Sequence, residues 1–77
     1  MKILVELRKD RHLTQKEVAK AIGISQSVYS YYENGRAEPT ANVIKKLCIF
    51  YQVSADYLLG LELLDGRKIY NITNNFY

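Results

Sequence analysis

The chain has 77 residues, of which 48% are hydrophobic, and a formal net charge of +3 at neutral pH. This length allows one domain at most, the hydrophobic content excludes a disordered chain, and the charge mildly favours a polyanionic partner. No apolar run is long enough to span a membrane, and the charged start MKILVELRKD lacks the apolar core of a signal peptide. The single cysteine, Cys48, excludes an intrachain disulfide and fits a reducing compartment. We therefore expect a cytoplasmic protein with no membrane partner.

The first part of the chain predicts two short helices. Apolar residues at helical spacing over residues 2–11 predict the first. Thr14 and Glu17 are spaced as a capping box, in which each side chain accepts a hydrogen bond from the backbone N–H of the other residue. The second helix should therefore begin after Thr14 and run to Ile22. Gly23 suits the left-handed residue that ends it.

The third predicted helix has two unlike faces. Ser25 is a candidate N-cap, the helix runs from Gln26 to Asn34, and Gly35 suits its C-cap. At roughly 100° per residue, the apolar face carries Val28, Tyr29 and Tyr32. The opposite face is polar and uncharged, and carries Gln26, Ser27, Ser30 and Tyr31. Such a face suits the floor of a DNA groove better than a protein core.

Two further helices complete the predicted pattern. Thr40 can cap a helix over residues 41–51, and Ser54 can cap a short helix from Ala55 to Leu59 that stops at Gly60. We expect an all-α fold with five helices in a domain over residues 1–60. Its core should draw on Leu4, Leu7, Leu13, Val18, Ala19, Ile22, Ile24, Tyr29, Tyr32, Val43, Ile44, Leu47, Cys48, Tyr51, Val53, Leu58 and Leu59.

Residues 61–77 form a C-terminal extension that breaks the helical pattern. Asp65-Gly66 between two apolar-rich runs is a hairpin signal, and the alternative is a helix over residues 61–64 that continues the preceding one. An isolated hairpin is barely stable in water, so an ordered one should pack on the helices or on a second subunit. The apolar residues that favour a subunit interface here are Leu61, Leu63, Ile69, Tyr70 and Ile72.

Residue types and spacings over the first 60 positions also follow a known pattern. The matching residues are Leu7-Arg8, Thr14-Gln15, Val18-Ala19, Gly23, Ile24-Ser25, Glu33-Asn34-Gly35, Pro39, Leu47, Val53-Ser54 and Tyr57-Leu58-Leu59-Gly60. With these, residues 4–60 resemble the helix-turn-helix DNA-binding domain of the Cro/phage-repressor (XRE) family. The resemblance covers about three quarters of the chain and implies a five-helix lambda-repressor-like fold.

The resemblance implies that the third helix is a recognition helix, which lies in the major groove of double-stranded DNA. Gln26 and Ser27 match base-reading positions, and glutamine can form a bidentate pair with adenine. Ser30 and Tyr31 lie one turn further on, within reach of base edges, a thymine methyl group or a phosphate. Family members often carry arginine or lysine at the position of Tyr31, so the tyrosine weakens the expectation of a guanine contact.

Four other residues match positions that hold the DNA backbone. Gln15 starts the second helix, where free backbone N–H groups and the helix dipole attract phosphate. Asn34 and Arg36 follow the recognition helix and match further backbone contacts, and Lys16 adds a longer-range attraction. Such contacts fix the register on DNA without reading its sequence.

These polar residues also have simpler interpretations. A lone glutamine or serine on a helix is most often only solvated, and Arg36 belongs to a common type of loop cation. Tyr29 and Tyr32 could stack on bases, but their face of the helix favours the core.

Four residues have structural roles. The resemblance implies an ion pair between Arg8 and Glu33, which links the first helix to the end of the third. His12 stands where the family usually has glycine or a similar turn residue, so we expect a turn with positive φ there and no metal ligand. Cys48 replaces a small apolar residue, which predicts a buried, inert thiol.

The sequence offers no recognisable set of catalytic residues. One histidine, one cysteine and scattered carboxylates supply no nucleophile–base set, metal motif or phosphate loop, so we expect no enzyme, metal or cofactor. The resemblance implies a bacterial or phage transcriptional regulator, most often a repressor, that binds an inverted repeat as a homodimer with recognition helices about 34 Å apart. Two alternatives remain: an antitoxin whose tail masks a toxin, and a protein-interaction module without DNA binding. The set of Gln15, Gln26, Asn34 and Arg36 argues against the module.

Overall fold

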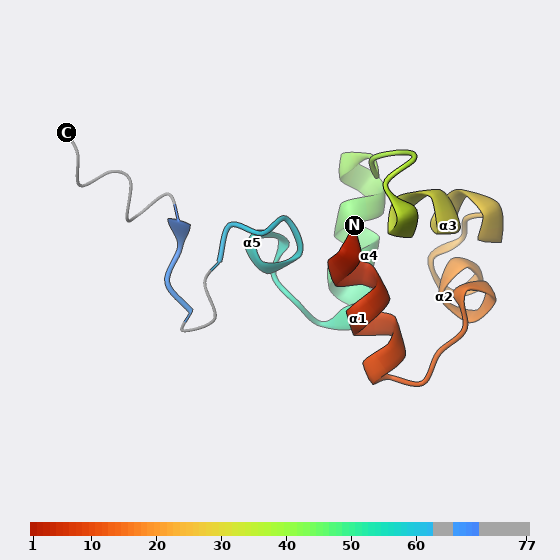
Figure 1. Cartoon of the computed structure of the whole chain (residues 1–77), viewed down its shortest axis with the longest axis horizontal. Coiled ribbons are helices and arrows are strands. Elements are labelled where there is room, and N and C mark those ends of the chain that lie inside the picture. The colour runs from red at the N-terminus through yellow and green to blue at the C-terminus, as the bar shows by residue number, and fades with distance from the viewer. Residues whose placement is uncertain (63–65, 70–77) are drawn as a thin grey trace.

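The described part of the chain folds as five short helices around one core (Figure 1). The computed structural model describes residues 1–62 and 66–69. In chain order the helices are α1 (Lys2–Asp10), α2 (Gln15–Ile22), α3 (Gln26–Asn34), α4 (Ala41–Tyr51) and α5 (Ala55–Leu58). Figure 1 shows α1 and α4 at the centre, α2 and α3 at one end and α5 on the opposite side. The expected all-α fold is confirmed. Within the described ranges, no helix has the length and apolar character that crossing a membrane requires.

The helices begin at the capping residues that the sequence predicts. The Thr14 hydroxyl accepts a hydrogen bond from the Glu17 backbone N–H at 3.1 Å, and the Glu17 carboxylate accepts one from the Thr14 N–H at 2.9 Å. Ser25, Thr40 and Ser54 each accept a bond from the backbone N–H three residues on. Caps of this kind stabilise a helix by about 1 kcal/mol each. Four of the five helix starts are therefore encoded locally.

Among the residues that the structure describes, two other than glycine adopt the left-handed conformation. His12 has a φ of 55°, which confirms the turn expected between α1 and α2. Gln52, which ends α4, has a φ of 57°. The sequence carries no signal for this at Gln52, because glutamine is not among the residues that favour positive φ. Each position costs roughly 1–2 kcal/mol relative to an unstrained backbone.

The core is built from the apolar faces of all five helices. Its buried hydrophobic residues are Leu4, Leu7, Val18, Ala19, Ile22, Tyr29, Tyr32, Val43, Leu47, Tyr51 and Leu58. Leu59 was expected among them but is 51% exposed. The reason is geometric: α5 ends at Leu58, and one residue further the side chain points about 100° away from the face that Leu58 buries.

The rim of the core is less buried than the sequence suggests. Leu13, Ile24, Ile44, Cys48 and Val53 pack against the core but are only partly buried. Burial nevertheless raises the pKa of the Cys48 thiol, which favours its protonated, less reactive form.

The core also contains polar groups that find partners. The hydroxyls of Tyr29 and Tyr51 lie 2.8 Å apart and share a hydrogen bond, and burial raises the pKa of both. Arg11 links α1 to the end of α4, because it donates to the carbonyls of Leu7 at 3.0 Å and Tyr51 at 2.7 Å. Its guanidinium also lies 5.1 Å from the centre of the Tyr51 ring. These contacts fasten α1, α3 and α4 to one another.

The two described pieces of the C-terminal extension lie antiparallel. Glu62 and Lys68 form an antiparallel bridge, and the Ile69 N–H donates to the Leu61 carbonyl at 2.7 Å. Lys68 also pairs with the Glu62 carboxylate at 3.0 Å. Leu61 and Glu62 are not helical, so the alternative of a helix over residues 61–64 is wrong at its start. The expected turn residue Asp65 and the interface residues Leu63, Tyr70 and Ile72 lie outside the described residues.

Candidate nucleic-acid interface

The turn between α2 and α3 brings the two helices together within three residues. Gly23 adopts a left-handed φ of 76°. The Ile24 N–H donates to the Ala19 carbonyl at 3.0 Å, which closes the last turn of α2. Ser25 then caps α3. Because glycine takes this conformation at little cost, the chain can reverse sharply here, and α2 and α3 pack side by side at one end of the molecule (Figure 1).

The two faces of α3 have separate environments. Tyr29 is fully buried and Tyr32 is 7% exposed, while Val28 is partly buried. These side chains belong to the core, which excludes base stacking by Tyr29 and Tyr32. The other face of α3 is thereby the one presented to solvent.

The four residues expected to read bases gather in one place. Gln26, Ser27 and Tyr31 are exposed, and Ser30 is half-buried between them. Together with Gln15 from the start of α2, they line an open hollow of about 270 Å³. No charged side chain lines it. The hollow therefore offers hydrogen-bond donors and acceptors from both helices, with one aromatic ring at its edge.

Gln15 has a contact that sequence reasoning missed. Its amide nitrogen donates to the Glu33 carboxylate at 3.0 Å, so α2 is tied to the last turn of α3. One N–H and the carbonyl oxygen of the Gln15 amide stay available, because this bond uses a single hydrogen. Glu33 therefore fixes the direction in which Gln15 presents its remaining polar groups. The two residues are 18 positions apart, and no local pattern signals the pair.

Arg8 and Glu33 form the ion pair that the family resemblance implies. The guanidinium makes two bonds to the carboxylate, from Nε to Oε2 at 2.6 Å and from Nη2 to Oε1 at 3.0 Å. The side chains are only 13% and 4% exposed. Arg8 also donates from Nη1 to the Leu13 carbonyl at 3.0 Å. A paired, fork-shaped contact of this kind fixes geometry as well as charge.

The electrostatics of Glu33 reflect a balance between burial and bonding. Burial opposes its ionisation most strongly, but hydrogen bonds from Arg8, Gln15 and Tyr29 outweigh it, and the pKa of the carboxyl lies below its ordinary value. The hydrogen bond to Glu33 raises the pKa of Arg8. Glu33 is therefore a buried anion on which α1, α2 and α3 converge.

The residues expected to hold the DNA backbone lie around the hollow in different settings. Asn34 and Arg36 form a local turn, because the Arg36 N–H donates to the Asn34 side-chain oxygen at 3.1 Å. The Arg36 guanidinium lies 5.9 Å from the centre of the Tyr31 ring, within cation–π range. Lys16 is exposed in the first turn of α2 but does not line the hollow. The structure thus brings Arg36 to Tyr31, while Lys16 follows Gln15 in the chain without lining the hollow.

Metal chemistry finds no site in the described ranges, where no three histidine, cysteine or carboxylate residues are placed to hold an ion. The arrangement of α2 and α3 is suited to binding a ligand rather than to metal chemistry. It combines an uncharged polar face, the free N–H groups at the start of α2 and a cation at one edge.

The helix pair, its glycine turn and its supporting core define a helix-turn-helix domain of the lambda-repressor type. The family described as Helix-turn-helix matches residues 4–58, and the chain belongs to this family, of which the XRE-type regulators are members. No solved structure matches the chain significantly.

Three relatives illustrate the range of the family. The chain is 34% identical over 73 residues to the HTH-type transcriptional regulator ImmR of Bacillus subtilis (95% of this chain, 58% of the relative). It is 42% identical over 48 residues to the cryptic phage CTXphi transcriptional repressor RstR of Vibrio cholerae (62% and 43%). It is 34% identical over 73 residues to the antitoxin PezA of Streptococcus pneumoniae (94% and 46%). The chain spans about half the length of the curated relatives it matches.

Proposed function

We propose that this protein is a sequence-specific DNA-binding transcriptional regulator that acts as a repressor. The observation that carries the proposal is the hollow in which Gln15 and the four polar residues of α3 meet, on a helix whose aromatic side is buried. A regulator of this kind needs no catalytic group. It works in the compartment that holds the DNA, so we propose a cytoplasmic location.

In the proposed complex, α3 lies in the major groove. Gln26, near its N-terminus, pairs with adenine through the N6 and N7 atoms, a contact that discriminates by roughly 1–3 kcal/mol. Ser27 and Ser30 add bonds of low specificity. Tyr31 presents its ring and hydroxyl at the edge, where a thymine methyl group or a phosphate is the partner. Its contact with Arg36 restricts the orientation of both side chains.

The DNA backbone is held at both ends of the helix pair. Gln15 presents its second N–H to a phosphate beside the start of α2, where the helix dipole favours an anion. Asn34 donates from its NH₂ group, because a phosphate oxygen only accepts, and its own oxygen accepts from the Arg36 N–H. Arg36 and Lys16 supply positive charge. These four residues set the register, and α3 reads the sequence.

We further propose a homodimer that binds an inverted repeat, with the DNA-binding domain in residues 1–60 and the extension, residues 61–77, at the interface together with α5. Two recognition helices about 34 Å apart then enter successive major grooves. Leu61, which is 39% exposed just beyond the end of α5, supports this placement. A small domain also gains stability from burying such residues in a dimer.

Selection of bound sites from random double-stranded DNA tests the proposal. We expect enrichment of a motif made of two symmetric half-sites, each with an adenine whose replacement weakens binding. Because phosphate contacts strengthen as salt falls, the absence of any binding even at about 50 mM salt would support a protein-interaction module instead. Enrichment of a single unrepeated half-site would contradict the dimer and leave the base-reading role in place.

A second candidate is an antitoxin that binds DNA through the same domain. The similarity to PezA over nearly the whole of this chain favours it. Expression of the tagged chain from its own genomic region would then co-purify a toxin in stoichiometric amount. Purification of the chain without such a partner, combined with an operator found by selection, would favour the repressor.

A further inference from the structure

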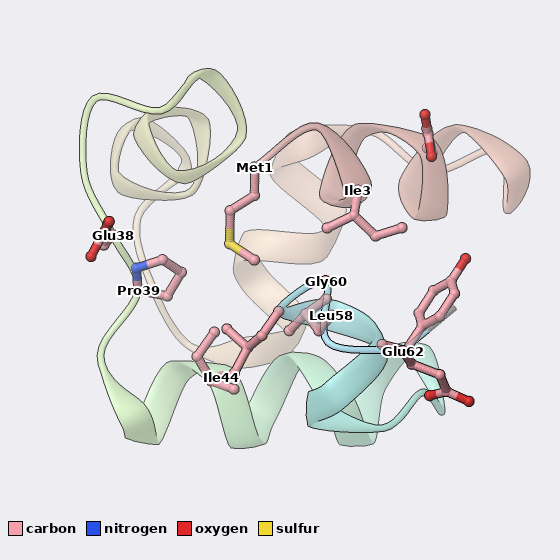
Figure 2. A pocket seen from close by; sticks show the side chains of 11 residues that line it. Met1, Ile3, Glu38, Pro39, Ile44, Leu58, Gly60 and Glu62 are labelled. Atoms are coloured by element: carbon pink, nitrogen blue, oxygen red, sulfur yellow. The ribbon is translucent and has the colours of Figure 1, made fainter. Parts of the chain in front are cut away.

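A groove between α1, α4 and α5 has an apolar lining and lies apart from the α3 hollow. Its volume is about 610 Å³. Figure 2 shows Met1 and Ile3 on one side, facing Ile44 of α4 and Leu58 of α5 on the other. Pro39 and Leu59 complete the apolar lining. None of its lining residues lines the hollow on α3, so the two surfaces are separate. We call it the α1–α4–α5 groove.

The rim of this groove is acidic although the chain as a whole carries a net charge of +3. Glu6 of α1, Glu38 in the loop before α4 and Glu62 after α5 line it, and no lysine or arginine does. Figure 2 places Glu38 and Glu62 at opposite ends. Glu62 is paired with Lys68 at 3.0 Å, whereas among the described residues Glu6 and Glu38 form no ion pair. The negative charge of these two carboxylates is therefore available to a partner.

An apolar floor with an acidic rim selects against two occupants. Nucleic acid is disfavoured because its phosphates carry the same charge as the rim. A second copy placed by two-fold symmetry on the same groove would bring the two acidic rims toward each other. The complementary ligand has apolar side chains along one stripe and positive charges on both flanks.

We propose that the α1–α4–α5 groove binds an amphipathic helical segment of a partner protein, with leucine-like side chains on the floor and lysine or arginine residues opposite Glu6 and Glu38. This is a helix-in-groove contact, in which residues about three and four positions apart supply the anchors. Since the groove and the α3 hollow share no lining residue, the partner and DNA can be held at the same time. The proposal does not depend on which DNA sequence is read.

Titration of the ¹⁵N-labelled full chain with two synthetic helical peptides tests the proposal. Both peptides carry the same leucine face, and their flanks carry either lysine or glutamate. We expect the lysine peptide to bind at least about tenfold more tightly, since each exposed charge pair contributes modestly, and to shift the amides of Ile3, Ile44 and Leu58. Equal affinities, or shifts confined to other surfaces, would overturn the proposal.

Three variants sharpen this test. The double variant Glu6→Gln/Glu38→Gln should reduce the preference for the lysine peptide about three- to tenfold. Asp10→Asn removes an exposed carboxylate of α1 outside the groove and should leave the preference unchanged. Leu59→Ser, at an exposed floor position, should lower the affinity for both peptides by the same factor. If the double variant behaved as Asp10→Asn does, the acidic rim would have no role and the proposal would fail.

Two outcomes without peptide would also overturn the proposal. Resonances of Ile3 and Ile44, on the side of the groove away from α5 and the extension, would identify a second copy as the occupant if they shifted with protein concentration. Nuclear Overhauser contacts between the groove and residues 70–77 would identify the chain's own end.

Discussion

Replacing Arg8 with methionine should leave Glu33 as a buried charge without its cation. The Glu33 side chain is 4% exposed, and Arg8 makes two bonds to it at 2.6 and 3.0 Å. Breaking a buried ion pair from one side costs about 3–5 kcal/mol. Because Gln15 still hydrogen-bonds to the carboxylate, we expect the lower end, about 3 kcal/mol. A domain of this length has a stability of roughly 4–12 kcal/mol. At about 4–8 °C per kcal/mol, a loss of about 3 kcal/mol should lower Tm by roughly 12–24 °C.

The pH dependence of this variant tests the cause of the loss. In the native protein the pKa of Glu33 is lowered, so its contribution to stability is complete above the unfolded value and is lost as pH falls through the native value. Burial disfavours the charged form of Glu33, and Arg8 stabilises that form. Without Arg8, the pKa of Glu33 should therefore rise relative to that in the native protein. The difference in unfolding free energy between the two proteins should therefore shrink as pH falls from about 7 to about 4.

Urea denaturation followed by far-ultraviolet circular dichroism measures this difference, since the chain has no tryptophan. Lys9→Met, at the exposed neighbouring position of α1, is the matched control and should change stability by about 0.5 kcal/mol or less. A loss below about 1 kcal/mol at neutral pH, or a difference that does not change with pH, would refute the role of Glu33 as a buried anion held by Arg8.

Four further substitutions separate local effects. Gln26→Ala should relax base preference at one position of each half-site, by about 1–3 kcal/mol in discrimination, and leave non-specific affinity nearly unchanged in fluorescence anisotropy titrations. If Gln26→Ala instead weakened binding to every sequence equally, its base-reading role would be contradicted. Arg36→Ala should weaken binding to all DNA sequences alike and reduce the slope of log affinity against log salt concentration by about one. Thr14→Ala removes the capping box and should lower the unfolding free energy by about 1 kcal/mol in urea titrations. His12→Gly should raise it by up to about 1 kcal/mol, because glycine relieves the positive φ; a destabilised variant would show that His12 makes a contact worth more than this strain.

Local rules account for most of the fold. The capping residues Thr14, Ser25, Thr40 and Ser54 place four helix starts correctly, because a cap depends on residues only three positions apart. The left-handed turn at Gln52 was not predictable from its residue type, because glutamine is not among the residues that favour positive φ.

Burial was harder to predict at the ends of helices than in their middles. Leu59 was expected in the core and is 51% exposed. A helix as short as α5 shows too little periodicity to say which side its last residue faces. Periodicity worked well over α3, where it separated buried Tyr29 and Tyr32 from exposed Tyr31.

The α3 hollow gathers residues that the sequence singled out, but the contacts that support them were not predicted. The residues of the α3 hollow follow from helical periodicity and from the family resemblance. The Gln15–Glu33 bond and the Tyr29–Tyr51 bond join residues 18 and 22 positions apart, so no local pattern could indicate them. The contact between Arg36 and Tyr31 was equally hidden, because it depends on the path of the loop after α3.

The proposed function requires that the polar face of α3 reads a DNA sequence. To test this, the affinity of the full chain for its selected site is compared with its affinity for a scrambled duplex of the same length and composition, at physiological salt. We expect a ratio of about 10³ or more, as is typical of specific regulators. Equal affinity for the two duplexes would contradict the proposed function.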